Sequence, residues 1–190
     1  MNTIKETFLK AWLILSSPTK AWQQITSDKT ENSLSALRFF YTLLLIGVGA
    51  TFFGSLLYKS GFHFVGALLK SIIVGISLYG GFWGIYFLLL EALKKYIRII
   101  PDKQTCLQLV IYSYTAILII DIITALVPSF FFLKIINLYT VYLVWEGVGL
   151  LFDFEEKNRG NLVLSLSISM IVFPYIIERI LFYLLPTANF

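Results

Sequence analysis

Two carboxylates lie inside long apolar runs, and they are the residues of this sequence best placed to do chemistry. Asp121 falls within the run Cys106–Val127, and Glu146 falls within the run Phe130–Phe152. An ionised side chain at the centre of a membrane helix costs about 2.5–3.5 kcal/mol on insertion scales, so each carboxylate requires a partner, water or a function. Both runs can cross a bilayer, and the Pro-Ser pair that joins them predicts a helical hairpin.

Depth along the predicted helices separates the two carboxylates. At 1.5 Å per residue, Asp121 lies about 22 Å from the cytoplasmic end of its helix, whereas Glu146 lies about 9 Å from the cytoplasmic edge. They are therefore too far apart for a catalytic dyad. Asp121 shares its level with Arg179 and Lys134. We expect an ion pair between Asp121 and one of these cations, and Arg179 is preferred because its planar guanidinium matches a carboxylate.

Glu146 admits two interpretations. It is either a carboxylate near the membrane interface, neutralised by a basic residue, or a protonatable, ligand-binding group in a cavity on the cytoplasmic side. The basic residues at its level are Lys94, Arg98 and Arg159.

No combination of residues predicts an enzyme. The chain has one histidine, His63 in an outer loop, and one cysteine, Cys106, which are too few nitrogen and sulfur ligands for a zinc-type site. No Ser/His, Asp/Asp or metal constellation lies at one depth. We therefore predict no enzyme, no metal and no cofactor, with Asp121, Glu146 and Arg179 as candidate binding groups.

Composition sets the class of protein that must position these groups. Of the 190 residues, 58% are hydrophobic and only 14% are charged, whereas soluble domains are about a quarter charged. The net charge of +4 comes from basic residues between the apolar runs, which indicates membrane topology and not a nucleic-acid partner. The fold class is an all-α polytopic membrane protein.

Five apolar runs predict five transmembrane helices, with the lipid bilayer as the main partner. Eleven of the fifteen basic residues lie in the N-terminal segment up to Arg38 or in the second and fourth loops, which places the N-terminus in the cytoplasm and the C-terminus outside. We divide the chain into a cytoplasmic interfacial segment, residues 1–35, and a five-helix membrane domain, residues 36–190. The predicted spans are Ser35–Tyr58, Gly66–Leu93, Cys106–Val127, Phe130–Phe152 and Leu162–Leu185.

The first 35 residues predict one or two short amphipathic helices. Apolar residues at helical spacing favour a helix in the headgroup region, and Ser17-Pro18 favours the start of a second helix. These apolar sides either face lipid or pack on the spans. They comprise Ile4, Phe8, Ala11, Trp12 and Leu15 in the first helix, and Ala21, Trp22 and Ile25 in the second.

Small residues recur four apart in the second span, as in Ser77/Gly81 and Gly80/Gly84. Such pairs let helix backbones approach closely in lipid. They form either a face for a homo-oligomer or, in the interpretation we prefer, a contact with the other spans of the same chain.

Three segments resemble the Yip1-domain family. They are the stretch Ser17–Ile25, the stretch from Tyr112 through Pro128 to Leu150 that includes Trp145-Glu146-Gly147, and the basic Lys157–Arg159 loop before the last span. The resemblance implies five membrane helices and a cytoplasmic N-terminus. Eukaryotic members are associated with Golgi and endoplasmic-reticulum membranes and with Rab-type GTPases. The short N-terminal part here is more similar to bacterial members, which implies the bacterial inner membrane.

Two functions fit these observations. The first is a non-enzymatic scaffold, trafficking or membrane-organising protein that acts on a protein partner through its cytoplasmic loops. The second is a small transporter, channel or lipid-moving protein with a polar cavity at Asp121 or Glu146. A polar cavity at either carboxylate would favour the second function, and a dry bundle would favour the first.

Overall fold

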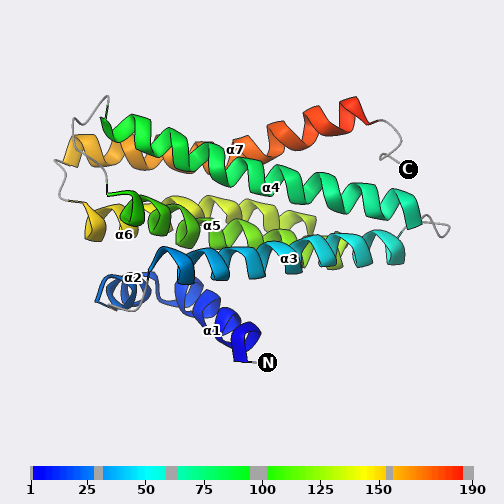
Figure 1. The fold of residues 1–190 in the computed structure, drawn as a ribbon, viewed down its shortest axis with the longest axis horizontal. Helices are drawn as coiled ribbons and strands as arrows, with labels where there is room; N and C mark the ends of the chain where they lie inside the picture. Colours follow the sequence, from blue (N-terminus) through cyan, green and yellow to red (C-terminus); the bar gives the residue numbers. More distant parts are fainter. Residues whose placement is uncertain (1, 28–31, 59–63, 95–101, 153–155, 186–190) are drawn as a thin grey trace.

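The structure is a computed structural model that describes residues 2–27, 32–58, 64–94, 102–152 and 156–185. The described residues form helices along almost their whole length, in agreement with the predicted all-α class (Figure 1). In chain order they are α1 (Asn2–Ser16), α2 (Pro18–Ser27), α3 (Ser33–Tyr58), α4 (Phe64–Ala92), α5 (Lys103–Leu126), η2 (Pro128–Leu138), α6 (Tyr139–Leu151) and α7 (Glu156–Leu184).

Five helical segments are long and apolar enough to cross a membrane, which confirms the predicted multi-pass architecture. Each matches one of the predicted runs to within a few residues, except that the last helix begins earlier than expected. The candidate spans are Ser33–Leu57, Phe64–Ala92, Lys103–Leu126, Pro128–Leu151 and Arg159–Leu184.

Helix α5 lies at the centre of the bundle. Within its most apolar stretch 67% of residues are buried, compared with 17% in the span formed by η2 and α6. α5 packs against α3 on one side and against η2 and α6 on the other, while α4 and α7 pair along their length (Figure 1). The aromatic core between α3, α4 and α5 includes Phe40, whose ring stacks on Phe82 at 4.1 Å.

The glycines of α4 serve contacts within the chain. A Cβ atom at Gly81 would lie 2.7 Å from the ring of Pro174, and Gly84 faces Phe173 in the same helix, α7. Gly75 lies against Val48 of α3. The preferred interpretation of the small-residue pattern, packing against the other spans, is therefore confirmed. Pro174 cannot donate a backbone hydrogen bond inside α7, and Figure 1 shows α7 changing direction along its length.

The first half of the fourth span differs from the expected α-helix. It is η2, an 11-residue 3₁₀ segment with a break at Phe130, whose φ of −89° and ψ of 20° are not helical. Runs of 3₁₀ helix beyond three or four residues are uncommon. Because a 3₁₀ helix has three residues per turn, every third side chain of η2 falls on one face.

Helix α2 packs on the spans, which decides between the two alternatives left open for its apolar side. Ala21, Trp22 and Ile25 are all buried against the bundle, and Trp22 Nε1 donates a hydrogen bond to the carbonyl of Leu143 at 3.1 Å. A Cβ atom at Gly147 would lie 2.6 Å from Trp22 Cζ2, so the glycine makes room for the indole. Pro18 is the first residue of α2, as predicted.

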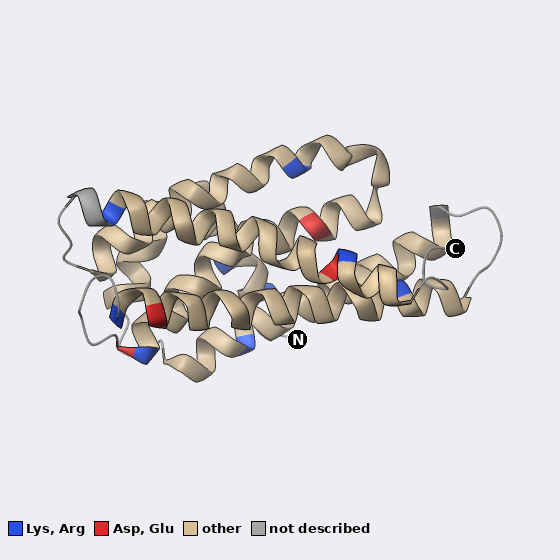
Figure 2. Cartoon of the chain, turned by 90° about the horizontal axis from the view of Figure 1, so that it is seen from above, with Lys and Arg blue, Asp and Glu red and all other residues tan. Residues whose placement is uncertain are grey.

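Helix α1 uses one side for packing and exposes another. Ala11 and Ile14 are buried, whereas Ile4, Phe8 and Trp12 are exposed. Figures 1 and 2 show the helix slanting along the flank of the bundle, with its N-terminal end beside the middle of the spans and not flat across their ends. Of the apolar side predicted for this helix, Ala11 therefore packs on the bundle, whereas Ile4, Phe8 and Trp12 do not.

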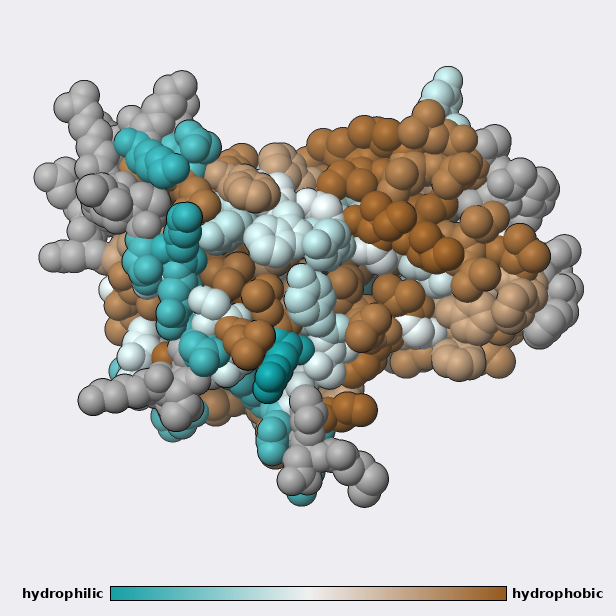
Figure 3. All heavy atoms as spheres, in the orientation of Figure 1, coloured by the Kyte–Doolittle hydropathy of each residue, from teal (hydrophilic) through white to brown (hydrophobic). Residues whose placement is uncertain are grey.

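Charged residues divide into two groups along the bundle (Figure 2). One group lies at the end that carries the α4–α5 and α6–α7 connections, and the other lies within the length of the helices. Figure 3 shows hydrophilic residues at the first end and around α1 and α2, and a broad hydrophobic surface toward the opposite end. This distribution is expected of a protein that spans a bilayer.

Asp102 caps the N-terminus of the central helix. Its carboxylate accepts hydrogen bonds from the backbone N–H of Thr105 at 3.0 Å and from the Thr105 hydroxyl at 2.6 Å. These bonds, above all that from the hydroxyl, hold the pKa of Asp102 below its ordinary value of 3.8. The cap therefore contributes fully above that value, and its contribution is lost as the pH falls through the lowered pKa.

We expect Asp102→Ala to lower the free energy of unfolding by about 1 kcal/mol, because the first turn of α5 loses its acceptor. Thermal unfolding of the purified protein measures this loss. Asp102→Ser keeps an N-cap acceptor and serves as the control. Equal losses in the two variants would show that the cap bonds contribute nothing.

Candidate functional site

Two adjoining cavities lie between α3, α4, α5, η2 and α7. Their volumes are about 400 Å³ and 260 Å³. Val74, Asp121, Lys134 and Glu178 line both of them, so the two cavities share a polar wall. The bundle is therefore hollow at the first predicted carboxylate, Asp121.

Asp121 forms an ion pair at this shared wall. Its Oδ1 lies 3.8 Å from Lys134 Nζ, and the two side chains are 25% and 60% exposed, respectively. The predicted pairing with one of two cations is confirmed, but the preference for Arg179 is wrong. The Arg179 guanidinium lies over the ring of Tyr175, 5.0 Å from its centroid.

The 3₁₀ geometry of η2 explains why Lys134 is the partner. Residues 131, 134 and 137 follow the break at Phe130, are spaced by three and therefore share one face, and residue 128 precedes the break. All four line the cavities: Pro128, Phe131 and Lys134 the larger one, and Lys134 and Asn137 the smaller one. In an α-helix residues 131, 134 and 137 would drift by about 60° per step and would not share a face.

Asn137 places an unsatisfied acceptor at the smaller cavity. Its Oδ1 is buried and has no hydrogen-bond partner among the described residues. A buried polar atom without a partner costs about 1–3 kcal/mol. A donor that reached this atom would remove the cost.

Sequence reasoning missed Glu178 and Lys70 as members of the same site. Asp121, Glu178 and Lys70 all lie about 7–9 Å from the nearer end of their helix, at Leu126, Leu184 and Phe64, respectively. Depth counting could have grouped them. Lys70 lines the larger cavity only, whereas Glu178 lines both.

Glu146 lies elsewhere and lines neither cavity. Its Oε2 accepts a hydrogen bond from the hydroxyl of Thr19 in α2 at 2.8 Å. The basic partners proposed for it are engaged differently where they are described: Lys94 pairs with Glu91 at 3.7 Å, and Arg159 donates to the carbonyl of Trp145 at 2.9 Å. Arg98 and His63 lie outside the described residues. Glu146 thus acts as a contact between α6 and α2.

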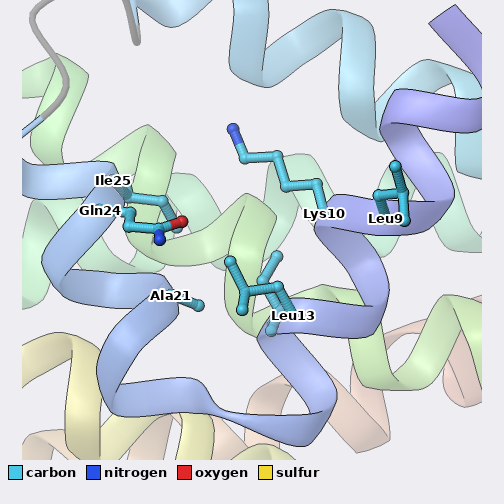
Figure 4. A pocket seen from close by; sticks show the side chains of 7 residues that line it. Leu9, Lys10, Leu13, Ala21, Gln24 and Ile25 are labelled. Atoms are coloured by element: carbon cyan, nitrogen blue, oxygen red, sulfur yellow. The ribbon is translucent and has the colours of Figure 1, made fainter.

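A third pocket, of about 320 Å³, lies between α1 and α2 (Figure 4). Its walls are mainly apolar, and Lys10 and Gln24 are its polar residues. The Lys10 ammonium donates to the hydroxyl of Tyr112 at 2.9 Å and lies 4.6 Å from that ring's centroid. Lys10 thereby fastens α1 to α5, and the pocket brings together no acid, base or nucleophile. Among the described residues, no group of three His, Cys, Asp or Glu side chains could hold a metal ion.

We expect removal of Lys134 to destabilise the protein, because Asp121 is left as an unpaired and largely buried carboxylate. Lys134→Gln should lower the free energy of unfolding by about 1–3 kcal/mol, between the values for exposed and buried ion pairs. Asp121→Asn in the same chain should restore part of the loss, as thermal unfolding of the single and double variants would show. Arg179→Gln, alone and combined with Asp121→Asn, is the matched control. Additive stability losses for Asp121→Asn and Lys134→Gln, together with non-additive losses for Asp121→Asn and Arg179→Gln, would contradict the ion pair.

Comparison with known families adds the identity of the whole chain. The profile of the Yip1 domain matches residues 12–177, from α1 to beyond Pro174 in α7. No curated protein matches the chain, and no solved structure matches it. The matched segment contains Trp22, Gly147 and both carboxylates. Since this match spans far more than half of the sequence and the five spans agree with it, the chain belongs to the Yip1-domain family of multi-pass membrane proteins.

Proposed function

We propose that this Yip1-domain protein is a non-enzymatic membrane protein that binds a small polar or amphiphilic molecule within its bundle, as a transporter or lipid-moving protein does. The observation that carries the proposal is the pair of cavities that meet at Asp121, Lys134 and Glu178. Charged residues are costly inside a membrane, and a purely structural bundle does not require Lys70, Asp121, Lys134 and Glu178 to line one cavity.

The two members of the ion pair come from spans that differ in burial. α5 contributes Asp121 from the rigid centre of the bundle, whereas η2 contributes Lys134 from the least buried span. Entry of a molecule would require displacement of the wall that η2 forms. Lys134, the more exposed member of the pair, lies on that wall.

In the orientation that the basic residues favour, the cavities lie in the outer half of the bacterial inner membrane, and the N-terminus is cytoplasmic. Water should reach the cavities from outside. Cysteines introduced at the cavities can test this access, because the single cysteine of the chain, Cys106, is buried.

Thiol labelling tests the proposal. In a Cys106→Ala background, Thr124→Cys places a thiol on the wall of the larger cavity, and Ile180→Cys places one on an exposed apolar side of α7 outside both cavities. A charged, membrane-impermeant maleimide added to intact cells should label Thr124→Cys and leave Ile180→Cys unlabelled. Absence of labelling at Thr124→Cys, in cells and in membranes open on both sides, would show that the cavities are closed to water and would refute the proposal.

A second candidate function is a scaffold that organises membrane partners, and the exposed side of α1 favours it. Ile4, Phe8 and Trp12 are exposed beside the bundle, while Trp22 fixes the adjoining α2 to the spans. A photoreactive residue in place of Phe8 should then cross-link one protein in native membranes, and Trp12→Glu should abolish the product. Cross-links to lipid alone would exclude a protein partner at α1. A homo-oligomer would require a face other than the glycines of α4, which contact the chain's own helices.

A further inference from the structure

We propose that the smaller cavity, between η2 and α7, binds a protonated amine. This inference rests on the proposed binding function and names the chemistry that the site would accept. The smaller cavity is lined by two carboxylates, Asp121 and Glu178, and by one cationic side chain, Lys134. Its lining therefore has an excess of negative charge, which attracts a cation and repels an anion.

Hydrogen-bonding capacity points to the same kind of ligand. An alkylammonium group has three N–H donors and no acceptor. The cavity offers the Oδ1 of Asn137, which is buried without a partner, and the carboxylate of Glu178, for which no ion pair occurs within 4 Å among the described residues. An ammonium that reached both acceptors would satisfy them, whereas an anion or a hydrocarbon would satisfy neither.

The charged residues around the two cavities set the direction in which a longer molecule would lie. Lys70 lines the larger cavity and not the smaller one, so the positive side chains increase toward the larger cavity. A molecule that carries an ammonium and an anionic group a few bonds apart would place the ammonium at Glu178 and Asn137 and the anion at Lys70 and Lys134. Apolar side chains of the smaller cavity, including Val74, Ile117 and Ile171, would contact the intervening carbon atoms.

Two sources carry this chemistry: the headgroup of an ethanolamine phospholipid and a small soluble amine. Calorimetric titration of the purified full-length protein with O-phosphoethanolamine tests the soluble source. Reconstitution into nanodiscs of phosphatidylglycerol, with and without phosphatidylethanolamine, tests the lipid source through the shift in the unfolding temperature. Binding in either experiment supports the inference, and binding in only one identifies the source.

Variants separate the amine site from general effects. Glu178→Gln and Asn137→Leu should each weaken binding at least tenfold, and Arg179→Gln, next in sequence to Glu178 but outside both cavities, should not. Glu178→Asp keeps the charge and should retain part of the affinity, which controls for loss of folding. Unchanged affinity in Glu178→Gln would overturn the inference.

The proposed function and the amine inference fail in different ways. If phosphatidylglycerol or inorganic phosphate binds and neither amine does, the inference is wrong while a binding cavity remains. If Thr124→Cys is not labelled and no probe binds, both fail. If ethanolamine lipid stabilises Glu178→Gln as strongly as the unmodified protein, the lipid acts elsewhere on the surface and the amine site is refuted.

Discussion

Trp22→Ala should unfold the junction between the N-terminal helices and the membrane bundle. The indole is 1% exposed, donates a hydrogen bond to Leu143 and meets the ring of Tyr112 edge-on, with the ring centroids 6.0 Å apart. Its truncation would leave a large cavity beside Gly147 and remove the hydrogen bond to the Leu143 carbonyl. Losses of about 3–5 kcal/mol are typical of such truncations, which corresponds to a fall in unfolding temperature on the order of 10 °C.

The chain supplies its own control for this experiment. Trp12, ten residues earlier, is 70% exposed, so Trp12→Ala removes the same side chain without creating a cavity. Limited proteolysis of the purified protein should release the N-terminal segment from Trp22→Ala and not from Trp12→Ala. Equal thermal stability of the two variants would show that α2 is only loosely attached.

Gly54→Ala should have the second large effect, because it separates the helices that form the core. An added Cβ at Gly54 would overlap the carbonyl oxygen of Ala125 and lie 2.8 Å from its carbonyl carbon. These are backbone atoms and cannot rotate away. We expect a loss of about 2–3 kcal/mol, in the upper part of the range for overpacked sites.

Gly49→Ala in the same helix is the matched control, because nothing lies within 4 Å of its added Cβ. In an exposed or open helical position, alanine in place of glycine stabilises by about 1 kcal/mol. Thermal unfolding should therefore shift in opposite directions for the two variants. A stable Gly54→Ala protein would mean that α3 and α5 do not approach closely at this point. Gly54 also lines the larger cavity, so the same variant should reduce labelling of Thr124→Cys.

Much of the fold could be predicted because a bilayer imposes length and apolarity on every span. The five spans and the internal use of the α4 glycines follow from these constraints. The burial of Trp22 could not be predicted in the same way. Lipid is as apolar as a protein interior, so an apolar helix side carries no signal that distinguishes contact with lipid from contact with another helix.

The candidate site was only half predictable for a related reason. Counting residues gives depth, and depth correctly placed Asp121 level with both Lys134 and Arg179. The choice between them depends on rotation about each helix axis, and that rotation differs between α-helical and 3₁₀ backbones. No feature of the sequence Pro128–Leu138 predicts a 3₁₀ backbone, so the face that Lys134 and Asn137 share could not be predicted.

The 3₁₀ conformation of η2 also affects the length of this segment. A 3₁₀ helix rises about 2.0 Å per residue and an α-helix about 1.5 Å, so rewinding the part of η2 that follows the break at Phe130, residues 131–138, would shorten the segment by about 4 Å. Because α6 is fastened below by Trp22 and Glu146, the shortening could only be taken up at the Pro128 end. This shortening would move the α5–η2 connection toward α6 and rotate Lys134 away from Asp121. The length of η2 and the presence of its ion pair are therefore coupled by geometry.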